Sequence, residues 1–308
     1  MARIPPSGRQ YRIAYRDQVS VITEVGGGLR TYTVGGRDVI DGYAEGELRP
    51  VGKGMPLLPW PNRIADGRYE FMGRTYQTAL TEPARRNAIH GLTQWMNWQA
   101  TDQHADRVTM SRALHPQDGY PFALSLAIHY RLSEEGLTVQ TTATNLGEQP
   151  CPFGSGHHPY LTVGTEYIDS AWLRLPALLR MEVDERLIPT RRLVPIEGTE
   201  YDFLEGRPIG ATKLDTAFTS VIPEADGLTR IRLQAPEGGP RLTLWMDVAY
   251  QYVMVFTGDT LPDQSRRRRS IAIEPMTCAP NAFQNRLGLV ILEPAKSITS
   301  RWGLTPNP

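Results

Sequence analysis

One carboxylate in this chain of 308 residues lies in a setting that suits proton transfer. Glu274 ends the short apolar run 271–273 and precedes Pro275, so we expect it where a β-strand gives way to a loop. Functional groups commonly lie at such strand ends. Burial beside apolar neighbours raises a glutamate pKa from about 4.3 toward the range useful to a general base. The alternative is a glutamate paired with a nearby arginine for structural reasons.

Histidines occur in two segments that also contain glycine. His157 and His158 are adjacent and precede Pro159, and His90 precedes Gly91. Neighbouring residues on an extended backbone point to opposite faces, so at most one histidine of the pair can readily face a shared pocket. The residue before a proline is held extended, which fixes the direction of His158 more firmly. A histidine pKa near about 6.5 suits proton delivery at neutral pH, whereas a core histidine with backbone partners is the structural alternative.

Several other chemistries lack their motifs. His90, His158 and Glu274 resemble a two-histidine, one-carboxylate set, but no pair has the close spacing of metal-binding segments, so we predict no metal site. A G-x-S-x-G nucleophile motif is absent, and the glycines at 26–28 are not followed by the Lys-Ser/Thr of a phosphate-binding loop. Two cysteines are too few for a disulfide framework.

Strands must position these groups, because the apolar residues recur at every second position. The clearest run extends over 122–132, and 137–141 follows the Glu135-Gly136 turn as an antiparallel partner would. The 28 glycines and 25 prolines have no period and fit many turns between short strands. No convincing long amphipathic helix pattern is present. Further strands are expected at 19–25, 68–77, 107–113, 228–234, 241–247, 251–256, 270–274 and 288–293.

The same pattern of short strands and turns continues along the whole chain, without a linker or a long repeat. We therefore predict an all-β protein, one large antiparallel β-sandwich domain over residues 1–308. Two smaller sandwiches with a boundary near 145–160 are the alternative. Candidate site residues on both sides of that boundary argue against it.

The charge balance and the lack of long apolar stretches exclude several partners. The 33 basic and 33 acidic residues give a net charge of zero, which argues against binding to a nucleic acid backbone. The basic run 266–269 is expected to be a solvated loop. The N-terminal residues lack an apolar signal core, and no stretch reaches the roughly 18 apolar residues of a membrane helix. We expect a soluble, cytoplasmic protein that binds neither nucleic acid nor a membrane.

Tryptophans accompany the polar segments. A pyranose has an apolar C–H face and hydroxyl edges, so aromatic rings beside polar groups suit a sugar pocket. Ordinary core packing is the alternative, and we expect it for at least half of these residues. They are Trp60, Trp95, Trp98 and Trp245.

Taken in order, the polar motifs resemble those of the aldose 1-epimerase (galactose mutarotase-like) family, in its bacterial branch with His-Pro-Tyr. Each motif is weak alone, but the ordered set is specific and covers nearly the whole chain. The motifs lie at 62–64, 66–67, 87–91, 119–122, 158–160, 213–218, 255–259 and 274–276.

The resemblance implies a large β-sandwich with an open sugar cleft and no cofactor. It implies Glu274 as the general base that removes the anomeric proton, and His158 as the general acid that protonates the ring oxygen. Ring opening, rotation about C1–C2 and reclosure then give the other anomer. His157 is a competitor for the acid role. The substrate-binding positions implied are Asn62, Arg63, His90 and Asp215.

We therefore expect an isomerase that acts on a free hexose, as a monomer or homodimer. One alternative is a sugar-phosphate 1-epimerase, for which Arg85, Arg86 and the run 266–269 would supply cationic groups. The other is a non-catalytic sugar-binding protein with the same pocket. A neutral sugar would also agree with the zero net charge, since it needs no electrostatic steering.

Overall fold

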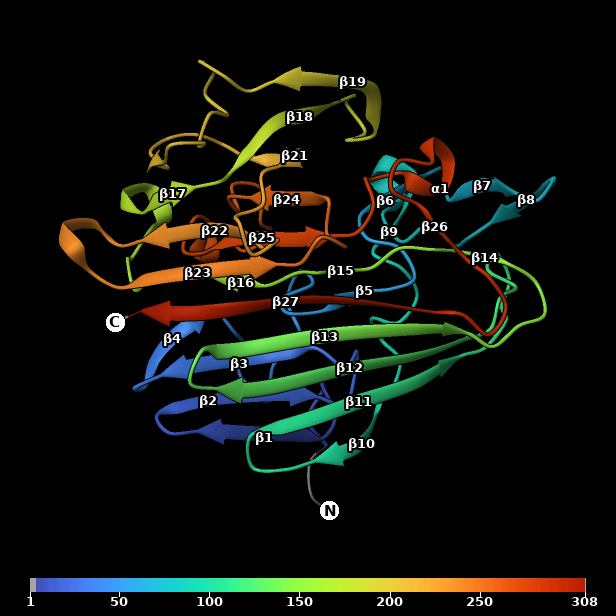
Figure 1. Ribbon diagram of the computed structural model, residues 1–308, viewed down its shortest axis with the longest axis horizontal. Helices are drawn as coiled ribbons and strands as arrows, with labels where there is room; N and C mark the ends of the chain where they lie inside the picture. Colours follow the sequence, from blue (N-terminus) through green and yellow to red (C-terminus); the bar gives the residue numbers. More distant parts are fainter. Residues whose placement is uncertain (1–3, 308) are drawn as a thin grey trace.

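The computed structural model describes residues 4–307, and antiparallel β-strands dominate it (Figure 1). β12 (Leu124–Ser133) shows why the sequence takes this form, since its alternate side chains are buried in the core. It forms a hairpin with β13 (Gly136–Asn145) in which Ser133 pairs with Gly136. The backbone of Gly136 has φ +109°, which favours glycine at this turn. The all-β prediction and this hairpin are confirmed.

One of the two large sheets contains nine strands. It is centred on the β12–β13 hairpin and on the long C-terminal strand β27, which pairs with both β13 and β23. In order across the sheet, the strands are β10 (Gln99–Gln103), β11 (Arg107–Leu114), β12, β13, β27 (Ser297–Asn307), β23 (Arg241–Met246), β22 (Thr229–Gln234), β17 (Trp172–Arg174) and β20 (Arg207–Pro208).

The other large sheet contains twelve strands. Ten follow one path, and the short strands β15 (Gly156–His157) and β5 (Pro56–Leu57) lie off it, with β15 paired to β25. Along the path, the strands are β1 (Gln10–Tyr15), β2 (Gln18–Thr23), β3 (Leu29–Val34), β4 (Arg37–Ile40), β16 (Tyr160–Leu161), β25 (Ile271–Met276), β24 (Tyr252–Phe256), β21 (Asp215–Val221), β18 (Ala177–Val183) and β19 (Pro189–Pro195).

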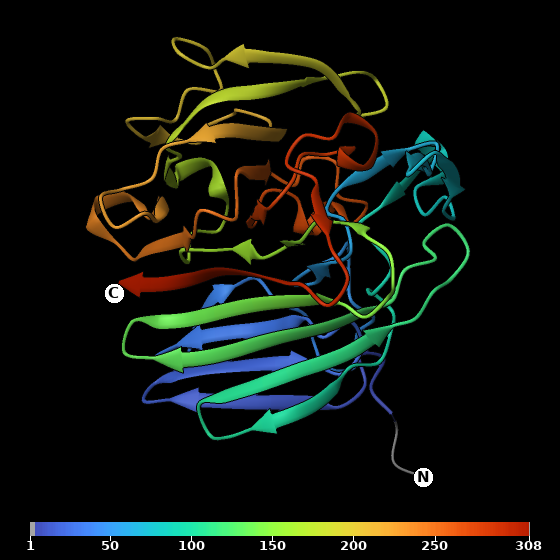
Figure 2. The same cartoon turned by 45° about the vertical axis from the view of Figure 1, so that its right-hand side comes forward.

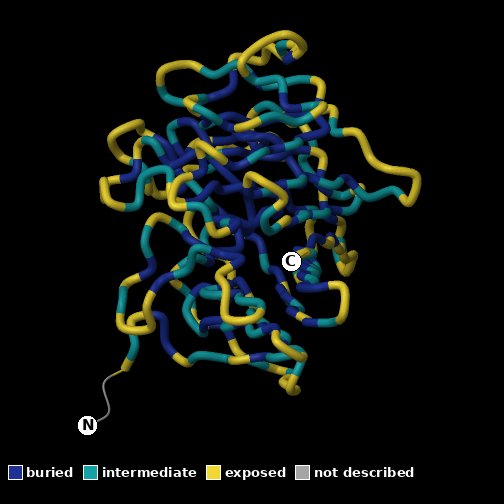
Figure 3. Tube along the Cα trace, turned by 90° about the vertical axis from the view of Figure 1, so that its left-hand side faces the viewer, coloured by how far each residue is buried: buried dark blue, intermediate teal, exposed yellow. Residues whose placement is uncertain are grey.

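The two sheets pack as layers. In both ribbon views the N-terminal strands, in blue, lie behind β11–β13, in green (Figures 1 and 2). Apolar side chains of both sheets form one large core, and the buried trace lies in the middle of the molecule while exposed turns surround it (Figure 3). Trp60 and Trp98 belong to this core, as expected for part of the tryptophan set.

Smaller elements complete the described chain. Three two-stranded sheets pair β6 (Arg63–Ala65) with β9 (Asn87–Ile89), β7 (Arg68–Phe71) with β8 (Arg74–Gln77), and β14 (Cys151–Phe153) with β26 (Val290–Leu292). Short 3-10 turns occur at Pro83–Arg85, Ile168–Ser170, Pro236–Gly238 and Gln264–Arg266, and the α-helix α1 spans Ala282–Asn285. Within residues 4–307, no helix is long and apolar enough to cross a membrane.

Each predicted strand region contains an observed strand, but one prediction about position was wrong. We expected a strand to end at Glu274, before Pro275. β25 instead continues to Met276, so Glu274 lies inside the strand. Proline lacks the N–H that a fully paired strand needs. β25 tolerates it because β15 and β16 flank β25 with an interruption between them, at 158–159.

The basic run 266–269 also differs from expectation. Arg266 pairs with Glu47 and Asp263, and Arg268 pairs with Asp169 and Asp259. The side chain of Arg268 is only 15% exposed. This segment is therefore an ion-paired part of the structure and not a freely solvated loop.

Candidate active site

The candidate site lies on the face of the twelve-stranded sheet opposite the main core. Ile273 of β25 belongs to that core, so its neighbour Glu274 points the other way. Glu274 pairs with Met254 of β24, which pairs with Ala217 of β21. Asp215 is two residues from Ala217, so it shares this face. The sheet register thus brings two carboxylates from distant parts of the chain to one side.

His158 lies at the interruption between β15 and β16. β15 pairs with β25 at Met276 and β16 pairs with it at Ala272, so the stretch around Glu274 faces the interruption. The Nε2 atom of His158 is 3.4 Å from Oε1 of Glu274. A local break in one strand therefore places an acid–base pair side by side.

Both members of this pair are almost closed to solvent and have unused hydrogen-bonding atoms. The side chains are 7% exposed for His158 and 3% for Glu274. Among residues 4–307, Nδ1 of His158 and Oε2 of Glu274 have no hydrogen-bond partner. Tyr160 stacks on the His158 ring at 5.0 Å with an 8° interplanar angle and so holds it in place. Unsatisfied buried polar atoms are costly, and a catalytic role or a bound water, ion or ligand is what explains them.

His157 points in the opposite direction, as expected for neighbours on an extended backbone. Its Nε2 atom is 2.8 Å from Oγ1 of Thr141 in β13, and its ring packs 5.3 Å from Trp302 of β27. Burial lowers the pKa of His157 to about 3. His157 therefore belongs to the packing between the two large sheets, and His158 alone of the pair reaches the site.

His90 lies beside His158, with ring centroids 5.3 Å apart. The backbone N–H of Asn62 donates to Nδ1 of His90 at 3.3 Å, which places the proton of a neutral His90 on Nε2. The backbone N–H of His90 in turn donates to the carbonyl of Asn62. The Asn62 side chain accepts from the N–H of Arg63 at 2.9 Å, so it shapes this segment.

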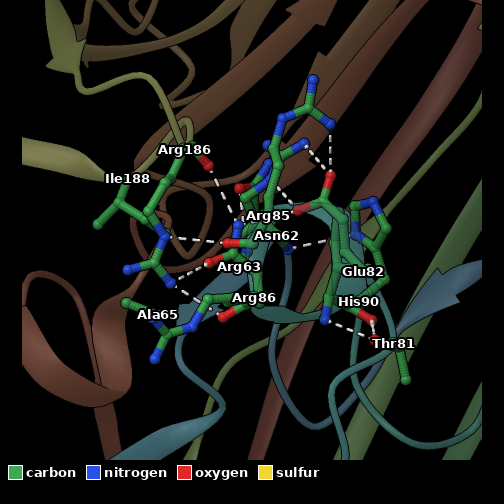
Figure 4. Close-up of polar contacts among 12 residues, drawn as sticks. Asn62, Arg63, Ala65, Thr81, Glu82, Arg85, Arg86, His90, Arg186 and Ile188 are labelled. Carbon is green, nitrogen blue, oxygen red and sulfur yellow. Dashed lines mark hydrogen bonds and ion pairs between the residues drawn. The ribbon is translucent and has the colours of Figure 1, made fainter.

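Arg63 adds a permanent positive charge to the site, and an acidic partner holds it in place. Its guanidinium makes two hydrogen bonds to Glu82, at 2.8 and 3.0 Å (Figure 4). Asn87 and Arg85 donate to the same carboxylate. Burial alone would raise the pKa of Glu82, but the hydrogen bonds from Arg63 and Asn87 hold it below its usual value. The paired geometry fixes the direction of Arg63.

A further cation fixes the same segment from the side of the β18–β19 turn. Arg186 donates to the carbonyls of Arg85 and Arg86 and pairs with Asp66 at 3.1 Å (Figure 4). Asp66 also accepts from Arg86. The loop that carries Glu82 is therefore clamped before any ligand binds.

Burial dominates the electrostatics of the acid–base pair. It raises the pKa of Glu274 well above its usual value, and the charge of Asp215 raises it further while Arg63 lowers it. Burial also raises the pKa of Asp215, against the effect of Arg63. Burial lowers the pKa of His158 to about 3. Since each partner resists its charged form, the pair is best described as sharing one proton.

The predicted residues His90, His158 and Glu274 converge closely, with one nitrogen or oxygen of each within 4.8 Å of the others. Such a group is compatible in donor type with a divalent metal ion. The absence of a metal stays a prediction from sequence spacing. Asp215 and Arg63 lie close enough for their charges to act on Glu274.

Sequence reasoning missed three residues that support the site. Glu82 pairs with Arg63 from 19 positions away, a distance that no local pattern reveals. Buried Lys53 lies 5.4 Å from the Tyr160 ring and bonds to Asp41. Buried Arg49 acts electrostatically on His90 and His158. In the sequence Arg49 lies between Leu48 and Pro50 and Lys53 between Gly52 and Gly54, so local sequence gives little sign that either cation is buried.

The chain matches a known family over nearly its full length. The profile of the aldose 1-epimerase family aligns with residues 10–305. The chain belongs to this family. The resemblance of the ordered motifs is thereby confirmed at the level of the family.

Curated relatives extend the comparison. The uncharacterized protein YihR of Escherichia coli K12 is 34% identical over 291 residues, which cover 94% of this chain and 91% of YihR. A maltose epimerase of Levilactobacillus brevis is 34% identical over 252 residues, covering 75% of this chain and 72% of that enzyme. Family members therefore include both a named epimerase and a protein without assigned function.

Solved structures share the fold. A GalM/aldose epimerase homologue from C. elegans superposes with a TM-score of 0.86 at 18% identity, covering 97% of this chain and 98% of that one. A putative aldose 1-epimerase from E. coli K12 gives a TM-score of 0.83 at 21% identity, with 97% and 99% covered. The galactose mutarotase-like β-sandwich predicted from the motifs is confirmed.

Proposed function

We propose that this protein is an aldose 1-epimerase that interconverts the α and β anomers of a hexose by acid–base ring opening. The observation that carries the proposal is the buried pair of His158 and Glu274, 3.4 Å apart. Each member retains one polar atom without a partner among residues 4–307. Anomer exchange needs one base for the anomeric hydroxyl and one acid for the ring oxygen, and these atoms lie close together on a pyranose.

The shared proton of this pair matches the proton requirements of the reaction. In the reactive state the proton is on His158 and Glu274 is a carboxylate. Glu274 takes the proton from the anomeric hydroxyl while His158 gives its proton to the ring oxygen, and the C1–O5 bond breaks. The pair is then in its other state, with a neutral His158 and a protonated Glu274. Reclosure after rotation about C1–C2 reverses both transfers, so the enzyme ends with the proton where it began.

The surrounding groups bind and orient the sugar. The Nε2–H of His90 donates to a sugar oxygen, and Arg63 supplies positive charge where oxygen charge develops. Asp215 accepts from hydroxyl groups. Asn62 acts through its hydrogen bonds to His90 and Arg63, so we assign it a positioning role.

The test is mutarotation of freshly dissolved single anomers, followed by polarimetry. Glu274→Gln and His158→Asn are each expected to lower kcat by at least about 100-fold, because each removes one proton-transfer group. The matched control is His157→Asn, the same substitution one residue away, measured below its melting temperature. It is expected to keep its turnover, because His157 faces the core. Full activity of either site variant would refute the assignment.

A second measurement separates catalysis from binding. A non-catalytic sugar-binding protein would bind the sugar in calorimetry without accelerating anomer exchange in the wild type. We expect acceleration by the wild type. We also expect Glu274→Gln to retain sugar binding, because the glutamine amide keeps the shape of the side chain and its capacity for hydrogen bonds.

A further inference from the structure

Arg49 is a buried cation that forms no ion pair with the residues that the structure describes. Its exposed fraction is 7%. Among residues 4–307 its guanidinium makes one hydrogen bond, from Nη2 to the carbonyl of Gln94 at 2.8 Å, and its buried Nε has no partner. The guanidinium also lies 4.5 Å from the ring of Trp95, which is 53% exposed. A buried charge without a counter-ion is costly, so its presence calls for an explanation.

Other cations around the site already have anionic partners within the described chain. Arg63 is held by Glu82, and Lys53 by Asp41. Among the candidates considered from sequence for binding a charged sugar, Arg85 shares Glu82 with Arg63, Arg86 pairs with Asp66, Arg266 with Glu47 and Arg268 with Asp259. Arg267 and Arg269 donate to the backbone carbonyls of Leu261 and Ser265. Arg49 differs from these arginines in being buried next to the site histidines while forming no ion pair with any residue that the structure describes.

The position of Arg49 is next to the acid–base pair. Arg49 begins the segment 49–55, whose residues Gly54 and Met55 hydrogen bond to the backbone of His158. A side-chain carbon on Gly52 would lie 3.5 Å from Cδ2 of His158, so this segment packs directly against the ring. Gln94 and Trp95 follow His90 closely in the sequence. Arg49 therefore joins the two segments that carry or support both site histidines.

Electrostatics agrees with this placement. Burial is the largest cause of the lowered pKa of His158, and the positive charge of Arg49 lowers it as well. The same charge lowers the pKa of His90, after the effects of burial, His158 and Arg63. An anion beside Arg49 would remove this effect and favour the protonated His158 that ring opening needs.

We infer that the substrate carries a single negative charge, which Arg49 neutralises beside the acid–base pair. This inference rests on the proposed mutarotase function and specifies its substrate class. The planar guanidinium has donors to spare and suits a carboxylate or a tetrahedral sulfate-type group. The single charge of Arg49 matches one negative charge, whereas a dianionic phosphate ester would carry a second charge that Arg49 does not neutralise.

The experiment compares kcat/KM for mutarotation of D-glucose with that of three glucose derivatives charged at C6. These are D-glucuronate, D-glucose 6-sulfate and D-glucose 6-phosphate, and equilibrium exchange NMR measures all four without a coupled enzyme. The wild type is expected to prefer at least one of the two singly charged sugars over D-glucose by tenfold or more. It is expected to prefer that sugar over the phosphate ester as well. A preference for D-glucuronate would indicate a planar anionic group, and a preference for D-glucose 6-sulfate would indicate a tetrahedral one.

Variants assign the preference to Arg49. Arg49→Gln is expected to lower the ratio of charged to neutral kcat/KM at least tenfold, and Arg49→Lys to retain part of the ratio because it keeps the charge. Arg86→Gln is the control, since this exposed arginine is paired with Asp66, and it is expected to keep the ratio. If Arg49→Gln does not fold, the ratios of charged to neutral kcat/KM in the wild type and in Arg49→Lys still test the inference.

The outcomes separate this inference from the proposed function. Equal or better turnover of D-glucose by the wild type would overturn the charged substrate and leave the mutarotase function intact. A preference for the phosphate ester, or a ratio that Arg49→Gln leaves unchanged, would overturn the assignment of a single charge to Arg49. No acceleration with any of the four sugars, or with other single anomers, would count against the mutarotase function itself.

Discussion

Asp215→Asn tests the electrostatic coupling between the two carboxylates of the site. Asp215 raises the pKa of Glu274, so its replacement by a neutral residue of the same shape lowers that pKa. In the proposed mechanism, Glu274 must be ionised to accept the anomeric proton. The acidic limb of the pH profile therefore moves to lower pH in the variant.

The size of this shift follows from the sheet. Glu274 and Asp215 are separated by β24, which makes two strand spacings of about 4.8 Å each, and by two residues of about 3.4 Å along the strand. The resulting separation of the two Cα atoms is about 12 Å. Because both side chains point to the same face, we use this value for the distance between the carboxylates. At an effective dielectric constant of about 20, two charges at this distance interact by about 1.4 kcal/mol, which corresponds to about one pH unit.

The assay is the pH dependence of kcat/KM for mutarotation, which reports on the free enzyme. Asp215→Asn is expected to lower kcat/KM as well, because a hydrogen-bond acceptor for the sugar is lost, but that loss does not move the limb. Asp226→Asn is the control, because this exposed aspartate pairs with Arg230 and is not among the charges that shift the pKa of Glu274. An acidic limb that stays in place or moves to higher pH in Asp215→Asn would refute the electrostatic argument.

Two further predictions concern stability. Because burial lowers the pKa of His157 to about 3, the unfolded chain binds a proton below about pH 6.5 that the folded chain does not. The free energy of unfolding therefore falls as pH falls from about 6.5 toward 3, and His157→Gln is expected to reduce this slope by about 1.4 kcal/mol per pH unit in urea titrations; an unchanged slope would contradict the buried, neutral state. Lys53→Met leaves Asp41, which is 30% exposed, without its cationic partner. This variant is expected to lower the free energy of unfolding by about 3 kcal/mol in the same titrations. The exposed pair formed by Arg16 serves as the comparison, since Arg16→Met should leave unfolding unchanged and an equal loss in both variants would refute the role of burial.

Much of the fold was predictable because burial follows the period of a strand. Alternation in β12 identified both the strand and its buried face, and the Glu135-Gly136 turn identified its partner. The same rule predicted that His157 and His158 would separate. The interior position of Glu274 was not predictable, because it depends on the interruption between β15 and β16, which lies more than 100 residues away in the sequence.

The site was predictable in its residues more than in its electrostatics. Ordered motifs identified His90, His158 and Glu274, which the structure brings together. Whether a charged side chain forms an ion pair depends on which side chain from elsewhere in the fold lies beside it. Arg63 has Glu82 as its partner, whereas Arg49 has none among residues 4–307, and nothing in the local sequence distinguishes these two arginines.

The separation of the site between a large sheet and outlying segments has a consequence for divergence within the family. Glu274 and Asp215 lie on strands whose backbone is fixed by neighbours across twelve strands. Arg63 and His90 lie in or next to the small β6–β9 sheet, and Arg49 lies in an irregular segment. Under the proposed function, substitutions of side chains in these outlying parts are expected to change which sugar is bound while the strands keep Glu274 and Asp215 in place.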